Sequence, residues 1–291
     1  MGQGLCVYVS CMARYWFSAG RASFVALTGL AEVCNQCGNQ AKVKEMLSVR
    51  LVKHALRMIT GNLSQALKVS VGPSLILIAT FAVIFGVGGL GDPETLTAPP
   101  LLMVMMFFIA FPVTLFVFGW IAVSWHRFIL LEEHSGMLPA YRGRPIWPYL
   151  WVLFVLGLRM FVVIIPFMFI LGGLFGNGSP AVFLFLILAL NILLSYLAMR
   201  WALPLPAKAI GTEMRFSESW KATAPLGSTI FGVVVALIVF NFAVGFIGGV
   251  FAPLPIIGFI INVAVSWLTG MLGISILTTL YGHIVEGRDL P

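Results

Sequence analysis

Six long apolar runs dominate the chain, and they limit its fold to a bundle of helices in a membrane. Each run is long enough to cross a hydrocarbon layer of about 30 Å at about 1.5 Å per residue. Lipid offers the backbone no hydrogen-bonding partner, so every spanning segment must satisfy its own amides as an α-helix. The spans predicted in this way cover residues 69–90, 101–125, 147–173, 181–203, 226–250 and 256–281.

The composition excludes two other classes of protein. Hydrophobic residues make up 60% of the chain and charged residues only 9%, whereas soluble domains average about 45–50% and about 25%. A soluble enzyme is therefore ruled out. A membrane β-barrel is excluded as well, because its strands would give short alternating segments instead of long apolar runs.

The positive charges predict the orientation of the spans. Of the 17 Lys and Arg residues, all but Arg159 fall in the terminal segments, in the loops after the second and fourth spans or, in the case of Arg200, at the end of the fourth span next to its loop. Basic residues concentrate in cytoplasmic loops, so both termini are predicted to be cytoplasmic. The net charge of +7 is then a topology signal, and we expect no binding of nucleic acid because no soluble basic surface is present.

The chain divides into four parts: an extension (1–45), an amphipathic helix (46–68), a six-span membrane domain (69–283) and a cytoplasmic tail (284–291). The extension lacks a clear pattern, and we expect translation to begin at Met46. It holds all the cysteines of the chain, Cys6, Cys11, Cys34 and Cys37. Their spacing is loosely compatible with zinc, but we predict no metal and no cofactor. Disulfides are not expected in a reducing cytoplasm.

The segment 46–68 is predicted to be an amphipathic helix at the membrane interface. At 100° per residue its apolar residues fall on one face, and its cations gather on a separate face. The apolar set is Val49, Val52, Leu56, Ile59, Leu63 and Leu67, and the cationic set is Arg50, Lys53, Arg57 and Lys68. Such a helix can place its cations against anionic headgroups. The alternative is an ordinary basic flank of the first span without a specific role in lipid binding.

Apart from Arg200 near the end of the fourth span, Arg159 is the only charged residue within a predicted span, which makes it a candidate for contact with lipid or substrate. Its span is longer than the membrane is thick, so the side chain can also reach the cytoplasmic interface without any such role. No acidic residue lies within the predicted spans. A partner would be Glu132 or Glu133 from the following loop, a backbone carbonyl or a lipid phosphate.

Asparagines in three later spans are the remaining candidates for contact with lipid or substrate: Asn191, Asn241 and Asn262. Close small residues and hydrogen-bonding side chains favour helix packing, and a polar translocation path is the alternative. Pro112 and Pro166 lie inside the second and third spans, where proline is expected to kink the helix.

One loop gathers groups that can bind metal or transfer protons, namely His126, Glu132, Glu133 and His134. Their spacing matches neither the HExxH helix of zinc hydrolases nor the paired Glu-x-x-His of di-iron bundles. A membrane-surface loop of mixed charge explains them better. We therefore predict no catalytic residue and no enzymatic activity.

Several short motifs resemble a known group of proteins. They are SWHRFILLEE, YRGRP, LPLPAKAIG, FSESWKAT with Ser219 and Trp220, and the ending LTTLYGHIVEG. Over residues 46–287 the chain resembles a family of uncharacterised bacterial six-span inner-membrane proteins, which is similar to the membrane domain fused to some glycerophosphodiester phosphodiesterases. The resemblance implies the fold and an inner-membrane location. It implies no catalytic residue, because that active site belongs to a separate soluble domain.

Together these features predict an all-α, multi-pass protein of the cytoplasmic membrane, with six spans arranged as three hairpins. Its expected partners are membrane lipids and other membrane proteins. We expect a non-enzymatic protein that organises lipids or partner proteins. The alternative is a transporter of a neutral or lipid-like substrate.

Overall fold

The computed structural model describes residues 47–88, 100–136, 138–174, 180–251 and 253–290. The extension 1–45, with its four cysteines and the predicted start at Met46, lies outside the described residues. The described part consists of helices joined by turns and loops, and it contains no strand. The predicted all-α class is thereby confirmed, as six of the helices are long and apolar enough to cross a membrane.

The six long helices form three sequential hairpins, as the short outer loops predicted. The first joins α3 (Leu63–Gly88) to α4 (Pro100–Met105), η1 (Met106–Ala110) and α5 (Phe111–Leu131). The second joins α6 (Ile146–Leu174) to α7 (Pro180–Trp201), and the third joins α10 (Gly227–Phe251) to α11 (Pro255–Ile284). Three short elements connect α7 to α10: α8 (Pro204–Ala209), α9 (Phe216–Ala222) and η2 (Ala224–Leu226).

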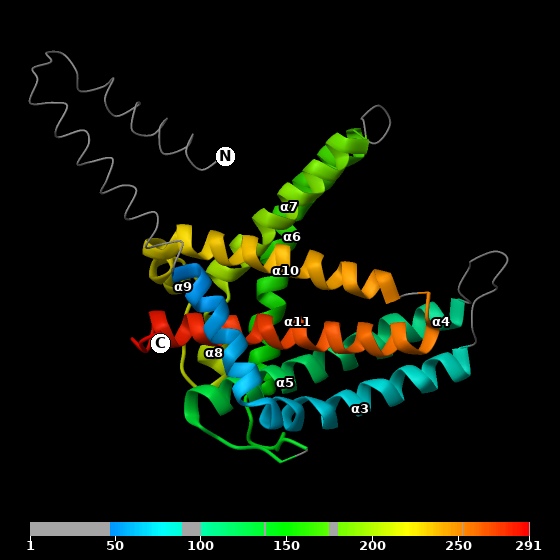
Figure 1. Cartoon of the computed structure of the whole chain (residues 1–291), viewed down its shortest axis with the longest axis horizontal. Coiled ribbons are helices and arrows are strands. Elements are labelled where there is room, and N and C mark those ends of the chain that lie inside the picture. Colours follow the sequence, from blue (N-terminus) through cyan, green and yellow to red (C-terminus); the bar gives the residue numbers. More distant parts are fainter. Residues whose placement is uncertain (1–46, 89–99, 137, 175–179, 252, 291) are drawn as a thin grey trace, which may run out of the picture.

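Four of the long helices, α3, α5, α10 and α11, run side by side, whereas the α6–α7 hairpin projects away from them at a steep angle (Figure 1). The hairpin stays attached at its base, because α6 packs against α5 and α8 and α7 packs against α10. Its outer parts carry large exposed apolar side chains, such as Phe169 and Phe185. In a bilayer these surfaces are covered by lipid.

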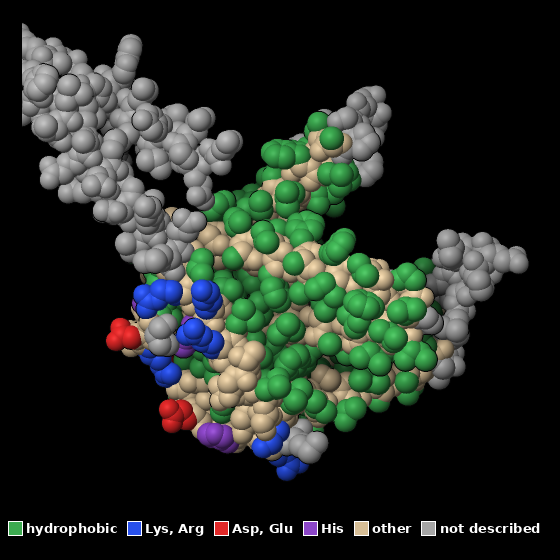
Figure 2. All heavy atoms as spheres, in the orientation of Figure 1, with side chains coloured by type: hydrophobic (Ala, Val, Ile, Leu, Met, Phe, Trp, Pro, Cys, Tyr) green, Lys and Arg blue, Asp and Glu red, His purple; other side chains and the backbone are tan. Residues whose placement is uncertain are grey.

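The main core lies toward the end of the bundle that carries the charges. Trp125 and Tyr149 are buried there, together with Leu203 from the α7–α8 connection and Leu272 from α11. Figure 2 shows Lys and Arg side chains gathered at this end, while the rest of that face is largely hydrophobic. We call this region the charged end: helix 47–61, residues 132–136 and 138–145, the segment 204–222 with α8 and α9, and residues 285–290.

The segment predicted as one amphipathic helix is divided in two. A helix covers residues 47–61, the chain turns at Asn62, and α3 starts at Leu63, six residues before the expected start of the span. Gly61 precedes the turn and has a low helix propensity. Helix 47–61 therefore runs in a different direction from α3 (Figure 1).

The second span contains a π-helical turn just before Pro112. The five residues of η1 form a π-helical turn directly before α5, in which the Phe111 N–H donates to the Met106 carbonyl. Proline has no N–H and its ring crowds the carbonyl four residues earlier, so the preceding turn widens. Pro166 instead lies inside α6, which continues through it to Leu174.

Candidate functional site

Arg159 lies on an exposed face of α6, close to the charged end. Its guanidinium carbon is 4.2 Å from the centre of the Phe216 ring and 5.8 Å from that of Trp201. Phe216 begins α9 and Trp201 ends α7, so Arg159 is level with the end of a spanning helix. The cation therefore lies where the apolar bundle surface meets the connecting segment, not in the middle of the bundle.

A pocket of about 660 Å³ opens beside Arg159. Two more cations line it, Arg215 and Lys221, both exposed. The aromatic rings of Phe216, Trp201 and Trp220 and the exposed Ser217 complete the lining. This volume falls in the usual range for small-molecule sites, about 300–1,000 Å³. None of the three cations is in an ion pair within the part of the chain that the structure describes.

A second arginine, Arg200, holds Trp220 of the pocket lining in place. It is buried, and its Nη2 donates to the Trp220 carbonyl at 2.8 Å while its Nε donates to the Thr223 hydroxyl at 3.2 Å. The guanidinium lies 3.5 Å from the centre of the Trp220 ring. In return, the buried Ser219 hydroxyl donates to the Arg200 carbonyl at 2.6 Å. These bonds hold α9 against the end of α7 and so fix the Trp220 ring.

The neighbouring carboxylate of Glu218 is engaged elsewhere. Its Oε2 accepts a hydrogen bond from the backbone N–H of Arg215 at 2.8 Å, at the start of α9. A carboxylate at this position satisfies a backbone donor that has no partner in the helix. Glu218 does not line the pocket, so the lining residues carry positive charge and no acidic group.

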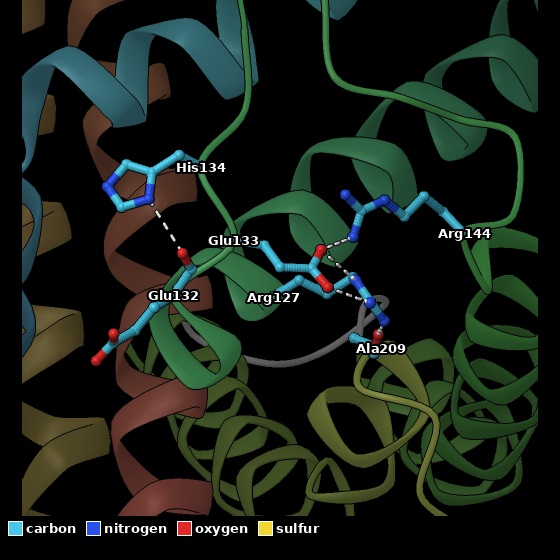
Figure 3. Close-up of polar contacts among 6 residues, drawn as sticks. All are labelled: Arg127, Glu132, Glu133, His134, Arg144 and Ala209. Carbon is cyan, nitrogen blue, oxygen red and sulfur yellow. Dashed lines mark hydrogen bonds and ion pairs between the residues drawn. The ribbon is translucent and has the colours of Figure 1, made fainter.

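The predicted cluster after the second span separates into two unrelated arrangements. Glu133 accepts hydrogen bonds from Arg127 Nε at 3.0 Å and Arg127 Nη2 at 2.5 Å, and it also pairs with Arg144 (Figure 3). Arg127 Nη1 donates to the Ala209 carbonyl at 3.0 Å, which ties this loop to α8. The hydrogen bonds from Arg127 are the largest cause that lowers the pKa of Glu133 from its ordinary 4.5 to about 2. Glu133 is thus not available to Arg159.

His126 is not part of that loop, because α5 continues to Leu131 and carries the imidazole into the core. The ring is fully buried, and its Nδ1 lies 2.8 Å from the Thr278 hydroxyl. That hydroxyl donates to the Ile274 carbonyl, so Nδ1 carries the hydrogen that Thr278 accepts. Glu132 and His134 stay in the loop, where His134 Nδ1 lies 3.0 Å from the Glu132 carbonyl (Figure 3). No set of three metal-binding side chains occurs among the described residues.

The cations predicted to face anionic lipid are all exposed. Arg50, Lys53 and Arg57 lie on helix 47–61, and Lys68 lies in the second turn of α3. Arg50 also donates a hydrogen bond from Nη2 to the Leu290 carbonyl, so it holds the C-terminal segment. Lys53, Arg57 and Lys68 make no ion pair in the part of the chain described.

The three candidate asparagines lie on three different helices, and each is exposed: Asn191 on α7, Asn241 on α10 and Asn262 on α11. Asn262 donates to the Gly258 carbonyl of its own helix at 2.9 Å. Its side-chain oxygen also approaches Gly248 of α10, where a Cβ would lie 3.0 Å away. This asparagine therefore contributes to the packing of α10 on α11.

Sequence reasoning missed the polar pairs in the core. Trp125 Nε1 donates to the Ser275 hydroxyl and Trp267 Nε1 donates to the Ser70 hydroxyl, both at 2.9 Å. These pairs join α11 to α5 and to α3. The available signal for the Ser275 pair was the group of hydroxyl residues in the last third of α11: Ser275, Thr278 and Thr279.

No protein-family model, no curated protein and no solved structure matches the chain. The described geometry supports a multi-pass membrane protein with six candidate spans.

Proposed function

We propose that this chain is a non-enzymatic protein of a bacterial cytoplasmic membrane that organises anionic lipids around helix 47–61 at its charged end. In this proposal both termini lie in the cytoplasm and the charged end faces the inner leaflet. The positive-inside distribution of Lys and Arg supports this orientation.

The observation that carries the proposal is the arrangement of helix 47–61 into three faces. Leu51, Ala55 and Ile59 point into the bundle and are at most 1% exposed. Val49 remains an exposed apolar side chain, and the cations Lys53 and Arg57 point outward. A helix that is docked on the bundle and also presents apolar and cationic surface is suited to the headgroup layer.

This geometry favours the interfacial role over that of an ordinary basic flank. A basic flank of the first span requires only positive charge. Helix 47–61 is in addition packed on the bundle, so that the backbone positions of its cations are fixed on the molecule. Each cation near an anionic surface contributes about 1 kcal/mol of attraction. Fixed cations can therefore concentrate anionic lipid at one place on the perimeter of the protein.

The transport alternative requires a polar path across the bundle. The exposed positions of Asn191, Asn241 and Asn262 on three helices favour a role in packing and lipid contact over a shared path. The core hydroxyl pairs of α11 lie near the charged end and join helices, which also favours a rigid bundle.

The test removes two cations of this helix, as Lys53→Gln with Arg57→Gln, and leaves Arg50 in place because Arg50 holds the C-terminal segment. The protein is extracted together with its surrounding bilayer, and the fraction of anionic lipid in the patch is compared with that of the whole membrane. We expect the enrichment to fall. The matched control, Arg142→Gln with Lys208→Gln, removes the same charge from other parts of the charged end and should keep it. Equal enrichment in all three proteins would refute the proposal.

A further inference from the structure

The pocket beside Arg159 differs from the exposed cations of helix 47–61 because it is a concave site assembled from three elements. Arg159 comes from α6, Trp201 from the end of α7, and Lys221 from α9. The buried Arg200 holds two of these elements together. The site is therefore built by the fold and is not a chance grouping on one helix.

The chemistry of the lining selects an anion that carries several oxygens. Arg159 and Arg215 each present a planar guanidinium, which matches phosphate oxygens in a bidentate arrangement, and Lys221 adds a point charge. The Ser217 hydroxyl can donate a further hydrogen bond. The Phe216 ring beneath the Arg159 guanidinium restricts where that group points.

The surroundings of the pocket select a lipid rather than a soluble anion. The face of α6 that carries Arg159 continues away from the charged end as exposed apolar residues, with Val162 68% and Phe169 78% exposed and Pro166 exposed between them. Residues three, seven and ten positions after Arg159 share its side of the helix. An acyl chain can lie along this strip while its headgroup occupies the pocket. Trp201 and Trp220 lie at the boundary, where tryptophan is favoured at membrane interfaces.

We propose that this pocket binds the phosphate of one anionic phospholipid, with Arg159, Arg215 and Lys221 on the headgroup and an acyl chain along Val162, Pro166 and Phe169. The inference deepens the proposed function, because it adds one specific lipid site to the general enrichment around helix 47–61. The sequence left several partners for Arg159 open, and this proposal selects the lipid phosphate.

The test measures lipid retained by the full-length protein in native mass spectra from detergent, during titration with phosphatidylglycerol. Phosphatidylcholine, which has a phosphate but no net charge, and inorganic phosphate are titrated separately. We expect one phosphatidylglycerol to be retained by the unaltered protein. Arg159→Gln and Lys221→Gln should each weaken its retention about tenfold, the value for loss of one charge-assisted hydrogen bond. Both residues are exposed, so neither change disturbs the core.

Arg142→Gln is the matched control, because Arg142 is an exposed arginine of the charged end that does not line the pocket. It should retain phosphatidylglycerol as the unaltered protein does. Retention that is equal in Arg159→Gln, Lys221→Gln and the control would overturn the proposal. Equal retention of phosphatidylcholine, or displacement of the lipid by inorganic phosphate, would overturn it too, since the site would then not select an anionic lipid.

The two proposals can fail separately. If Lys53→Gln with Arg57→Gln leaves the enrichment unchanged but Arg159→Gln loses the single retained lipid, the role of helix 47–61 is wrong and the pocket stands. If the enrichment falls and the single lipid is unaffected by Arg159→Gln, the pocket is wrong and the proposed function stands.

Discussion

At the scale of single residues, the hydroxyls of α11 determine how the helices are held together. Ser275→Ala removes the acceptor of the buried Trp125 Nε1 and leaves that donor without a partner. We expect a loss of about 1–3 kcal/mol in the free energy of unfolding. Ser266→Ala changes an exposed serine of the same helix and should be nearly neutral. Reversible unfolding in detergent measures both, and similar values for the two variants would contradict this account.

Glu133 gives the fold a dependence on pH. Its pKa is lowered from 4.5 to about 2 by the hydrogen bonds from Arg127, so its contribution to stability is present above pH 4.5 and is lost as the pH falls toward 2. The side chain is 33% exposed, and screening limits the contribution to about 1 kcal/mol.

The midpoint of thermal unfolding checks this expectation across that window of pH. The unaltered protein should unfold at a higher temperature than Glu133→Gln above pH 4.5, and the difference should vanish toward pH 2. Glu132→Gln serves as the control, because Glu132 has no ion pair within the described residues. A difference that does not change with pH would show that the ionised carboxylate is not responsible.

The sequence identified Arg159 as a charged residue in the interior of an apolar span, but it did not indicate which residues surround it. Phe216, Arg215 and Lys221 are more than fifty positions away in sequence, and only the packing of α9 on the end of α7 brings them to α6. His126 was grouped with Glu132, Glu133 and His134 because they are close in sequence. The extra turns of α5 separate them, since each helical residue rotates the side-chain direction by about 100°.

At the scale of elements, the position of helix 47–61 depends on a close approach to α10. A Cβ added at Gly232 would lie 2.8 Å from Ser48 Oγ and 3.0 Å from Ser48 Cβ. Gly232→Ala should therefore displace the start of helix 47–61 and cost about 1–3 kcal/mol, as overpacking does. We expect faster proteolytic cleavage within residues 47–61.

Gly61→Ala is the matched control for this change. An added Cβ at Gly61 meets nothing within 4 Å, and alanine favours helix by about 1 kcal/mol over glycine. This variant should be as stable as the unaltered protein or more so. Faster cleavage in Gly61→Ala than in Gly232→Ala would contradict the contact between helix 47–61 and α10.

The elements themselves were largely predictable, because the thickness of a bilayer sets the length of an apolar helix. Their ends were less so. Helix α5 continues six residues past the predicted end of its span at residue 125 and carries Arg127, since Arg127 finds partners in Glu133 and the Ala209 carbonyl. Helix length from hydropathy ignores such partners. The steep angle of the α6–α7 hairpin (Figure 1) depends on contacts at its base, and the spacing of apolar residues in the sequence does not predict these contacts.

At the scale of the whole molecule, the orientation in the membrane can be tested directly. In a protein with its four cysteines replaced by serine, a single cysteine is placed at Glu213, on the charged end, or at Leu254, which is 48% exposed between α10 and α11. A thiol reagent that cannot cross membranes should label Leu254→Cys in intact cells and Glu213→Cys only after the cells are opened. The opposite pattern would reverse the topology.

The native mass of the protein, released gently from its own membrane, tests whether the charged end binds anionic lipid. We expect protein that carries anionic phospholipid, with one lipid that persists when the others are stripped away. Added protein mass in fixed proportion, or a discrete small solute with no retained lipid, would contradict this expectation.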